Sequence, residues 1–381
     1  MTDQRAHKIA FIISAPSALR AFMAPHVVAL AETLSVTVYC NFATDDFSDL
    51  IPDHIRLVHV PFERKIDPLA DIRSFVALFF HLRRERYDAV HSLLPKAGLL
   101  GMVAAFLARV PVRIHTFTGQ IWATKRGVKR AILKSVDRLI ASLATHVFTD
   151  SPSQSAFLRG QGVCREANVL GDGSVAGVDQ SRFFPQPETG LKQRREIGIT
   201  ENAIVFGFLG RLTIDKGLLD LADAFATADL PGDAVLLLVG PDEENIVGTI
   251  RSRHSDLGDR LHVLDFTRHP ELVLNAFDVF CLPSYREGFG TSVIEAAACA
   301  VPTIASRIYG LTDAVEDGVT GLLHPPADAA AIRRLLEKLA ADPKLRDRLG
   351  QAALVRASAL FSQSRVVEEM KGFYRDLWRR A

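Results

Sequence analysis

The sequence predicts an α/β protein built from two doubly wound, parallel-sheet domains. Its 381 residues exceed one ordinary hydrophobic core and fit two domains of roughly 150–200 residues each. In both halves short apolar strands alternate with helices, which is typical of parallel crossover units. The glycine-rich segment 171–177 is a candidate linker between the halves. We therefore expect a first domain at 1–185, a second at 186–360, and a terminal helix at 361–381 that packs back on the first domain.

The first half contains six expected strands separated by helices. Residues 7–14 form an apolar strand, which runs into a short turn at Ala15-Pro16-Ser17. Ligands bind beyond the carboxyl ends of strands in such sheets, and polar residues stand at several of these ends: Ser14, His91, Ser92 and the run 115–120. The other strands are expected at 36–41, 55–60, 89–92, 112–116 and 147–150, with helices at 25–34, 72–85, 98–108 and 128–144.

The second half repeats the alternation without repeating the sequence. Strands are expected at 203–209, 234–239, 262–266, 279–282 and 303–306, with a helix at 218–227 behind the first of them. Residues 328–381 are expected to be helical throughout.

Composition limits the classes of partner. The net charge of +1 gives no indication of nucleic-acid binding. Residues 1–185 hold 22 Lys and Arg against 16 Asp and Glu, whereas the remainder holds 23 against 28. A basic first domain predicts an anionic acceptor or surface.

The helix expected at 128–144 concentrates this positive charge and also has an apolar face. Such a helix either lies on an anionic membrane or packs on its own sheet, and the sequence leaves both open. With the segment before it, this helix carries Lys125, Arg126, Lys129, Arg130, Lys134 and Arg138.

The cysteines and the apolar segments predict a soluble protein of a reducing compartment. The cysteines are scattered without metal-ligand spacing: Cys40, Cys164, Cys281 and Cys299. The longest apolar helix, 97–110, is shorter than the ~20 residues of a membrane span. We expect a cytoplasmic protein, with membrane contact limited to peripheral association with the inner membrane.

The stretch 280–302 carries two carboxylates around a glycine loop. Glu287 lies in the loop and Glu295 lies in the helix expected at 292–300, for which Thr291 is the expected N-cap. Either acid alone is typical of an ordinary surface, but together they could each bind a pair of ligand hydroxyls. A glycine loop before a helix also suits an anionic ligand.

Arg211 and Lys216 flank an earlier strand-to-helix turn. Two cations beside such a turn suit a diphosphate, since Arg can bind paired oxygens while Lys supplies a point charge. The sequence lacks a Walker-type glycine loop and lacks Gly-x-Gly-x-x-Gly after the first strand, which disfavours nucleotide hydrolysis and dinucleotide oxidoreduction.

These motifs together resemble the family 4 retaining glycosyltransferases. The resemblance rests on Gly210-Arg-Leu with Lys216-Gly217, and on Pro283-Ser with Glu287-Gly-Phe-Gly and Glu295-Ala. It implies the GT-B fold, two Rossmann-like domains facing a central cleft. The segments 115–120 and 171–179 resemble most the branch that builds bacterial capsule and O-antigen chains.

The resemblance implies a role for each matching residue. Arg211 and Lys216 would hold the donor diphosphate, and Glu287 would bind hydroxyls of the transferred sugar, making these three the catalytic set. Glu295 would accept from the ribose hydroxyls. The resemblance also implies retention at the anomeric carbon, a uridine donor, no cofactor and no metal, and a saccharide or lipid-linked saccharide acceptor. Further donor-binding positions are Gly210, Gly240, Phe266, Thr267, Gly288, Phe289, Gly290 and Thr291.

The first domain departs from the family pattern at two places. Ala15-Pro16-Ser17 stands where many members have a glycine pair, and Pro16 has no N–H to offer a phosphate. Thr118-Gly119 stands where many have His-Gly. His115 lies three residues earlier, although a histidine within a strand is more often a packed core residue. Ser14, His115, Thr118 and Gly119 are the expected acceptor-side residues. A nucleotide-sugar epimerase and a catalytically silent sugar-nucleotide-binding protein are the alternative functions.

Overall fold

The computed structural model describes residues 6–43, 47–63 and 67–379. These residues form two compact units. The first contains residues up to Ala176 together with the segment from Ser364 onward, and the second spans Gly177–Gln363. The division falls before the expected boundary at 185 because Val178 and Phe183 pack in the core of the second unit. Backbone hydrogen bonds also join Val178 to Phe361 and Gln363.

The first unit is organised around a seven-stranded sheet with the order β3-β2-β1-β4-β5-β6-β7, in which all neighbours are parallel. The central strands are almost wholly buried apolar runs, as expected for a sheet covered on both faces. The strands are β1 (Lys8–Ile13), β2 (Ser35–Cys40), β3 (Arg56–His59), β4 (Ala89–Leu93), β5 (Val112–Phe117), β6 (His146–Thr149) and β7 (Asn168–Val169).

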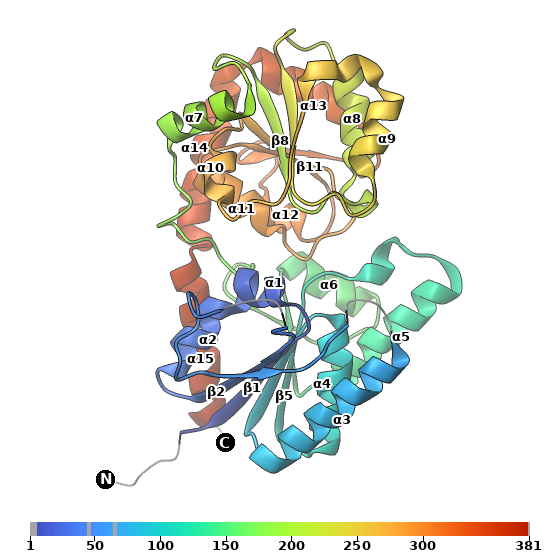
Figure 1. Cartoon of the computed structure of the whole chain (residues 1–381), viewed down its shortest axis with the longest axis vertical. Coiled ribbons are helices and arrows are strands. Elements are labelled where there is room, and N and C mark those ends of the chain that lie inside the picture. The colour runs from blue at the N-terminus through green and yellow to red at the C-terminus, as the bar shows by residue number, and fades with distance from the viewer. Residues whose placement is uncertain (1–5, 44–46, 64–66, 380–381) are drawn as a thin grey trace. The chain divides into compact units, whose positions relative to one another are not determined.

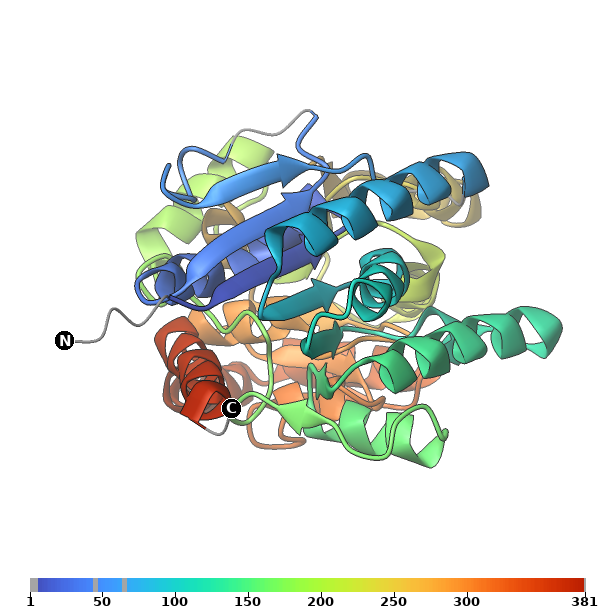
Figure 2. The same cartoon turned by 90° about the horizontal axis from the view of Figure 1, so that it is seen from below.

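Helices cover both faces of this sheet (Figure 1). One face packs on α2 (Ala24–Ala31) and α15 (Gln363–Arg379), and the other on α3 (Pro68–Glu85), α4 (Pro95–Leu107) and α5 (Gly127–Leu143). Figure 2 shows α3, α4 and α5 side by side in one layer, and α4 packs on both of its neighbours. A further helix, α6 (Pro152–Gly160), precedes β7.

The first helical segment starts earlier than the sequence predicts. Pro16 is the first residue of α1 (Pro16–Ala18), a position that suits proline because its missing N–H needs no helical partner there. A π-helical turn, Leu19–Met23, then leads into α2. Pro25 stands near the start of α2 and cannot donate an N–H to the preceding turn, which accounts for the wider turn.

The second unit has a six-stranded parallel sheet with the order β10-β9-β8-β11-β12-β13. This order and that of the first unit confirm the predicted pair of Rossmann-like sheets. The strands are β8 (Val205–Leu209), β9 (Val235–Val239), β10 (Leu261–Leu264), β11 (Val279–Leu282), β12 (Thr303–Ser306) and β13 (Gly321–His324). Its helices are α7 (Pro187–Ile197), α8 (Leu218–Thr227), α9 (Ile246–Arg253), α10 (Pro270–Leu274), α11 (Thr291–Ala298), α12 (Leu311–Ala314), α13 (Ala329–Ala341) and α14 (Pro343–Leu360).

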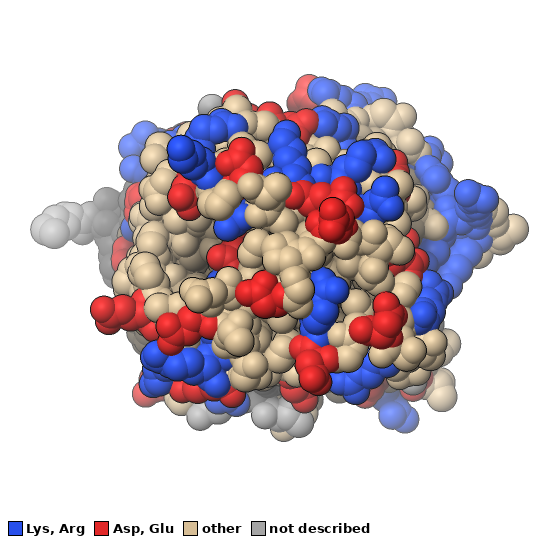
Figure 3. Space-filling model, turned by 90° about the horizontal axis from the view of Figure 1, so that it is seen from above, with Lys and Arg blue, Asp and Glu red and all other residues tan. Residues whose placement is uncertain are grey.

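The surface charges and the hydropathy of the helices complete the description. In the space-filling view of Figure 3, Lys and Arg side chains are interspersed with Asp and Glu over the face in view. Within the described ranges, no helix combines the length and the hydropathy that crossing a bilayer requires.

Buried histidines tie distant segments of the first unit together. Nδ1 of His91 lies 2.8 Å from the Tyr374 hydroxyl on α15, and its Nε2 lies 2.7 Å from the Thr116 hydroxyl. Nε2 of His26 lies 2.6 Å from the Val175 carbonyl, which fixes the glycine-rich segment on α2. Burial lowers the pKa of His26 to about 4 and the pKa values of His91 and His115 to about 3.

We predict that acid destabilises the first unit. Between the ordinary histidine pKa of 6.5 and the lowered values, the unfolded chain binds more protons than the folded chain. The free energy of unfolding therefore decreases as the pH is lowered through this range. Each histidine costs about 2 kcal/mol at pH 5. Asp137, whose pKa burial raises to about 6, acts in the opposite direction, but three histidines outweigh one carboxyl.

Both tryptophans, Trp122 and Trp378, lie in the first unit, so tryptophan fluorescence during urea unfolding follows this unit alone. The urea concentration at the midpoint of unfolding should be lower at pH 5 than at pH 7. These two pH values bracket the ordinary histidine pKa of about 6.5. Exposed His54 replaced by Gln is the control and should keep the same pH dependence. An unchanged midpoint in the unaltered protein would contradict the prediction.

Candidate functional site

Residues expected to bind a ligand follow four neighbouring strands of the second unit. Gly210 and Arg211 follow β8, Gly240 follows β9, Phe266 and Thr267 follow β10, and residues 283–290 follow β11. Because these strands are parallel neighbours, their carboxyl ends share one edge of the sheet. The strand order reverses between β8 and β11, where open α/β sheets bind ligands.

Glycines let the loops at this edge approach each other closely. Gly217 has a φ of +69°, and a Cβ there would lie 2.1 Å from the Pro283 carbonyl oxygen. Gly240 has a φ of +133°, and a Cβ there would lie 2.1 Å from the Gly210 carbonyl oxygen. A side chain at either position would therefore separate two loops that now touch.

Lys216 and Glu287 form the centre of the site. Lys216 donates from Nζ to Oε1 of Glu287 at 2.5 Å, and the Ser284 hydroxyl donates to the same oxygen at 2.8 Å. The two charged side chains are 22% and 14% exposed, so solvent screens this ion pair less than a surface pair. The structure thus joins two of the three predicted catalytic residues from loops that are 71 positions apart in sequence.

Arg211 is turned toward a different partner. It donates from Nη1 to Oε2 of Glu243 at 3.0 Å, and its side chain is 52% exposed. Glu243 follows β9, so this ion pair spans the β8 and β9 loops. Such an exposed pair contributes little stability and leaves Arg211 able to exchange its partner for an anionic ligand.

A second set of contacts fastens the two central loops, and sequence reasoning missed it. The Tyr285 amide donates to the Asp215 carbonyl at 2.9 Å, and Arg286 donates from Nε to the Asp215 carboxylate at 2.9 Å. The Tyr285 hydroxyl donates to Asp220 on α8 at 2.7 Å. Burial and the nearby Asp220 raise the Tyr285 pKa, which keeps this donor protonated. Asp215 and Arg286 stand next to Lys216 and Glu287 in the sequence, and their opposite charges could have indicated this second contact between the two loops.

Glu295 lies on α11 behind the glycine loop. Gly290, with a φ of +92°, precedes the helix and Thr291 is already helical, so the expected N-cap role of Thr291 is wrong. Gly290 is the N-cap instead, and its left-handed backbone differs from the extended φ and ψ that an N-cap residue normally has. Burial raises the pKa of the Glu295 carboxyl to about 7.

The remaining predicted donor-binding residues differ in what they present. The Phe289 side chain is fully buried and lies edge-on to Phe361 at 5.1 Å, so only its backbone borders the loop. Gly288 is buried, and its carbonyl oxygen would lie 2.5 Å from a Cβ at Gly310. The Phe266 side chain is 70% exposed, whereas the Thr267 hydroxyl accepts from the His269 amide at 3.0 Å.

Comparisons with known proteins match both halves of the chain. The model for glycosyl transferases group 1 matches residues 191–356, and the model for a glycosyl transferase 4-like domain matches residues 20–170. A capsular polysaccharide biosynthesis glycosyltransferase of Staphylococcus aureus is 30% identical over 88% of this chain and 89% of its own length. The chain belongs to the family 4 glycosyltransferases. It is therefore an enzyme of the glycosyltransferase class, in the branch of the bacterial capsule and O-antigen enzymes.

Other relatives agree with this assignment. A UDP-Gal:alpha-D-GlcNAc-diphosphoundecaprenol alpha-1,3-galactosyltransferase of Escherichia coli is 26% identical over 91% of this chain and 90% of its own length. Sucrose-phosphate synthase of Thermosynechococcus elongatus has a TM-score of 0.83 at 24% identity, covering 98% of this chain and all of its own. Anabaena HepE with UDP and glucose has a TM-score of 0.80 at 22% identity, covering 97% and 100%. The structural matches confirm the predicted GT-B fold.

In the first unit of this glycosyltransferase, the expected acceptor-side residues fall into two groups. His115 is buried, lies 2.8 Å from the Ser92 hydroxyl through Nδ1, and packs against Gly98 and Phe117. Ser14, Thr118 and Gly119 are partly exposed at the ends of β1 and β5. His115 is thus a packed core residue.

Two glutamines lie behind Thr118: Gln120, which belongs to the polar run 115–120 singled out in the sequence, and Gln154, which sequence reasoning missed. Gln154 donates from Nε2 to the Thr118 carbonyl at 2.9 Å and to the Gln120 side chain at 3.2 Å, and both glutamines are buried. They fix the backbone of the loop after β5. The sequence gives no periodic or motif signal that marks Gln154.

Three of the four cations on the basic helix α5 contact other segments of the first unit. Arg130 and Lys134 donate to the Gln161 side-chain oxygen at 3.1 Å and 2.9 Å, and both lie over the Trp122 ring. Arg138 donates to the carbonyls of Gln161 and Gly162. These three cations therefore support the turn after α6. Lys129, Val128 and Ile132 remain exposed on α5.

We predict that Gly217→Ala strains the site. The new Cβ must displace the Pro283 carbonyl, and alanine is disfavoured at a φ of +69°. The second unit should lose about 2 kcal/mol or more of stability, and the enzyme should lose activity as Lys216 separates from Glu287.

Differential scanning calorimetry of the full chain measures the loss. Gly232→Ala is the matched control, since nothing lies within 4 Å of a Cβ there and it should leave the thermogram unchanged. Equal behaviour of the two variants would show that the loops do not depend on the contact at Gly217.

Proposed function

We propose that this enzyme transfers a hexose or N-acetylhexosamine from a UDP-sugar, with retention at the anomeric carbon, to a lipid-linked or polysaccharide acceptor in the synthesis of a bacterial surface glycan. The observation that carries the proposal is the Lys216–Glu287 ion pair, which lies where the strand order of the second sheet reverses, between β8 and β11. A partly buried cation and carboxylate on two touching loops match an anionic, hydroxyl-bearing donor.

In this proposal the cations bind and stabilise the departing diphosphate. Lys216 and Arg211 carry their positive charge at the loop ends before the reaction begins, so no reorganisation is needed when charge develops on the leaving group. Glu287 accepts hydroxyl groups of the transferred sugar, and Glu295 accepts those of the ribose. We propose that these residues act without a metal ion or another cofactor.

The relatives support the choice of substrates. The E. coli enzyme is named for a UDP-galactose donor and a diphosphoundecaprenol-linked acceptor, and it aligns with nearly the whole chain. A related enzyme of Campylobacter jejuni, 25% identical over 91% of this chain, is likewise named for a diphospho-undecaprenol acceptor. A polyprenol-linked saccharide is the acceptor that we propose here.

Transfer from a nucleotide-sugar should require both members of the central ion pair. We expect Lys216→Ala and Glu287→Ala to lower kcat/KM about 100-fold or more, the effect typical of losing one electrostatic contact to a transition state. The measurement is transfer of radiolabelled sugar from UDP-sugars to a polyprenol-linked saccharide.

Lys192→Ala and Glu196→Ala are matched controls for this experiment, because they remove an exposed lysine and glutamate of the same unit. Both should keep wild-type rates. Activity of the site variants within a few-fold of wild type would refute the assignment. Conversion of UDP-sugar without any acceptor would favour the epimerase instead.

We also propose that the first unit binds an anionic membrane through the layer of α3, α4 and α5. Exposed apolar residues recur on one face of α3 at helical spacing: Leu69, Ile72, Val76 and Phe80. Arg73, Arg83 and Arg84 are exposed on the same helix. On α5, Val128 and Ile132 are exposed beside Lys129. Apolar side chains flanked by cations are typical of surfaces that lie in a lipid headgroup region.

Membrane binding should depend on these apolar residues rather than on Arg130 and Lys134. We expect Leu69→Ser with Phe80→Ser, or Val128→Ser with Ile132→Ser, to weaken co-sedimentation with phosphatidylglycerol vesicles several-fold. Each buried methylene group contributes about 0.8 kcal/mol to such binding. Val355→Ser, an exposed apolar position on α14, is the control. Binding that is unaffected by both pairs would exclude this surface.

A further inference from the structure

The Glu295 carboxyl is partly buried, yet no hydrogen bond or ion pair reaches its oxygens within residues 6–43, 47–63 and 67–379. Burial is the main cause of its raised pKa of about 7. Two charges of opposite sign modify that effect. Arg182 lowers the Glu295 pKa and Glu271 raises it. Glu295 therefore lies within electrostatic reach of an ion pair that is built from other segments.

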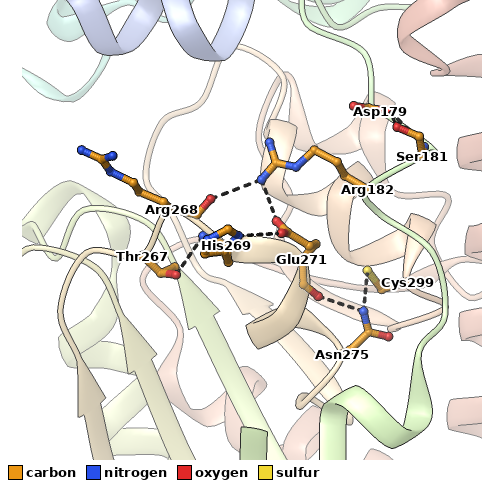
Figure 4. Close-up of polar contacts among 9 residues, drawn as sticks. All are labelled: Asp179, Ser181, Arg182, Thr267, Arg268, His269, Glu271, Asn275 and Cys299. Carbon is orange, nitrogen blue, oxygen red and sulfur yellow. Dashed lines mark hydrogen bonds and ion pairs between the residues drawn. The ribbon is translucent and has the colours of Figure 1, made fainter. Parts of the chain in front are cut away.

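Arg182 and Glu271 form that ion pair directly (Figure 4). Arg182 donates from Nη2 to Oε2 of Glu271 at 2.6 Å and to the Arg268 carbonyl at 3.3 Å. Glu271 is 12% exposed, and its other oxygen lies 3.2 Å from Nδ1 of His269. One carboxylate thus holds a cation from segment 177–186 and a histidine from the loop after β10.

Arg182 also fixes the loop that carries Phe266 and Thr267. The Arg268 carbonyl belongs to this loop, which is closed by the bond from the His269 amide to the Thr267 hydroxyl. The loop follows β10 at the same edge of the sheet as the other loops of the site. Its position depends on a side chain that precedes the whole second sheet in sequence.

A separate residue holds the segment in place, so Arg182 can be replaced without releasing it. Asn275 accepts from the Gln186 amide at 2.6 Å through Oδ1. Through Nδ2 it donates to the carbonyls of Glu271 and Phe184, at 2.8 Å and 3.2 Å, and contacts Cys299 at 3.5 Å. Asn275 therefore joins the segment, α10 and the end of α11 independently of the ion pair, as Figure 4 shows in part.

We infer that Arg182 and Glu271 are positioning residues of the nucleotide-sugar site: their ion pair fixes the loop 266–269 and sets the electrostatic potential at the Glu295 carboxyl. The inference rests on the proposed function, in which ionised Glu295 accepts from the donor ribose. Arg182 favours the ionised carboxylate that this role needs, and Glu271 opposes it while holding Arg182 in place.

Other ionisable groups around Glu295 do not take over this role. On α11 itself, burial raises the pKa of the Cys299 thiol, so that group is neutral. The packed strand β12 has no ionisable side chain and β11 has only the buried Cys281. From α14, Arg356 donates to the Asp313 carbonyl and lies over the Phe361 ring. His269 acts through Glu271 and is included among the variants below.

The test is the pH dependence of UDP-glucose binding to the full chain, measured by titration calorimetry from about pH 5.5 to about pH 8.5. UDP-glucose is the probe because its diphosphate is a diester, whereas a phosphate monoester titrates near pH ~6 and would obscure the result. As the pH is lowered below about 7, wild-type affinity should decrease by up to about tenfold per pH unit. The pH at which this decrease begins is called the midpoint below. Glu295→Gln should remove this dependence.

The two members of the ion pair should shift that midpoint in opposite directions. Arg182→Gln removes a positive charge and should raise the midpoint, whereas Glu271→Gln removes a negative charge and should lower it. His269→Gln removes the other side chain that contacts Glu271 and should retain the wild-type midpoint. A merely structural role would weaken binding at every pH for both variants, without opposite shifts.

The outcomes separate this inference from the proposed function. Midpoints that coincide with wild type, or that shift in the same direction, overturn the inference if Glu295→Gln still abolishes the pH dependence. If Glu295→Gln binds as wild type does, the ribose contact that the proposed function gives Glu295 fails. If wild type binds none of the UDP-hexoses and UDP-N-acetylhexosamines, the proposed function itself fails.

Discussion

The site depends on the close approach of two loops, the turn 213–217 after β8 and the segment 283–287 after β11. Gly217 permits this approach, since its backbone lies against the Pro283 carbonyl where a Cβ would not fit. The approach places Lys216 within 2.5 Å of Glu287 and joins Asp215 to Tyr285 and Arg286. The arrangement of these side chains is therefore a consequence of backbone packing at one glycine, and the ion pairs stabilise a geometry that this packing already imposes.

Much of the fold could be predicted because it follows local patterns. Apolar runs such as Val279–Leu282 are strands buried on both faces, and the helix Leu218–Thr227 was predicted with its observed bounds. Lys216, Glu287 and Glu295 could be named because they stand in a dense motif with fixed spacing. The sequence predicts that the first helix starts at Pro25, because proline is common at the first position of a helix. In the structure Pro25 lies inside a longer helical segment, which begins at Pro16 and passes through a π-helical turn at 19–23.

The partners of each charged residue could not be predicted from the sequence. Arg211 turns to Glu243, and Arg130 and Lys134 turn inward to Gln161, because the tertiary fold brings an acceptor near each of them. A run of positive charge on a helix indicates a basic face but does not indicate which cations the fold uses internally. For His115 the position in a strand favoured a core histidine and left a ligand contact open, and the structure packs the ring against Gly98. Tertiary contacts decide these cases, and such contacts are a property of the whole unit.

The ion pairs also explain how partly buried charges are tolerated in the site. A buried charge without a partner is costly, and removing one member of a buried pair costs about 3–5 kcal/mol. Lys216 and Glu287 neutralise each other, and so do Arg182 and Glu271. Glu295 has no such partner among the described residues, and its pKa rises toward neutrality instead. A donor that supplies phosphate to Lys216 and hydroxyls to Glu287 would replace the contact between these two residues with ligand contacts, while the Arg182–Glu271 pair stays in place. Binding then exchanges partners without creating unpaired charge, which is the condition for tight recognition of a doubly charged nucleotide-sugar in a partly desolvated site.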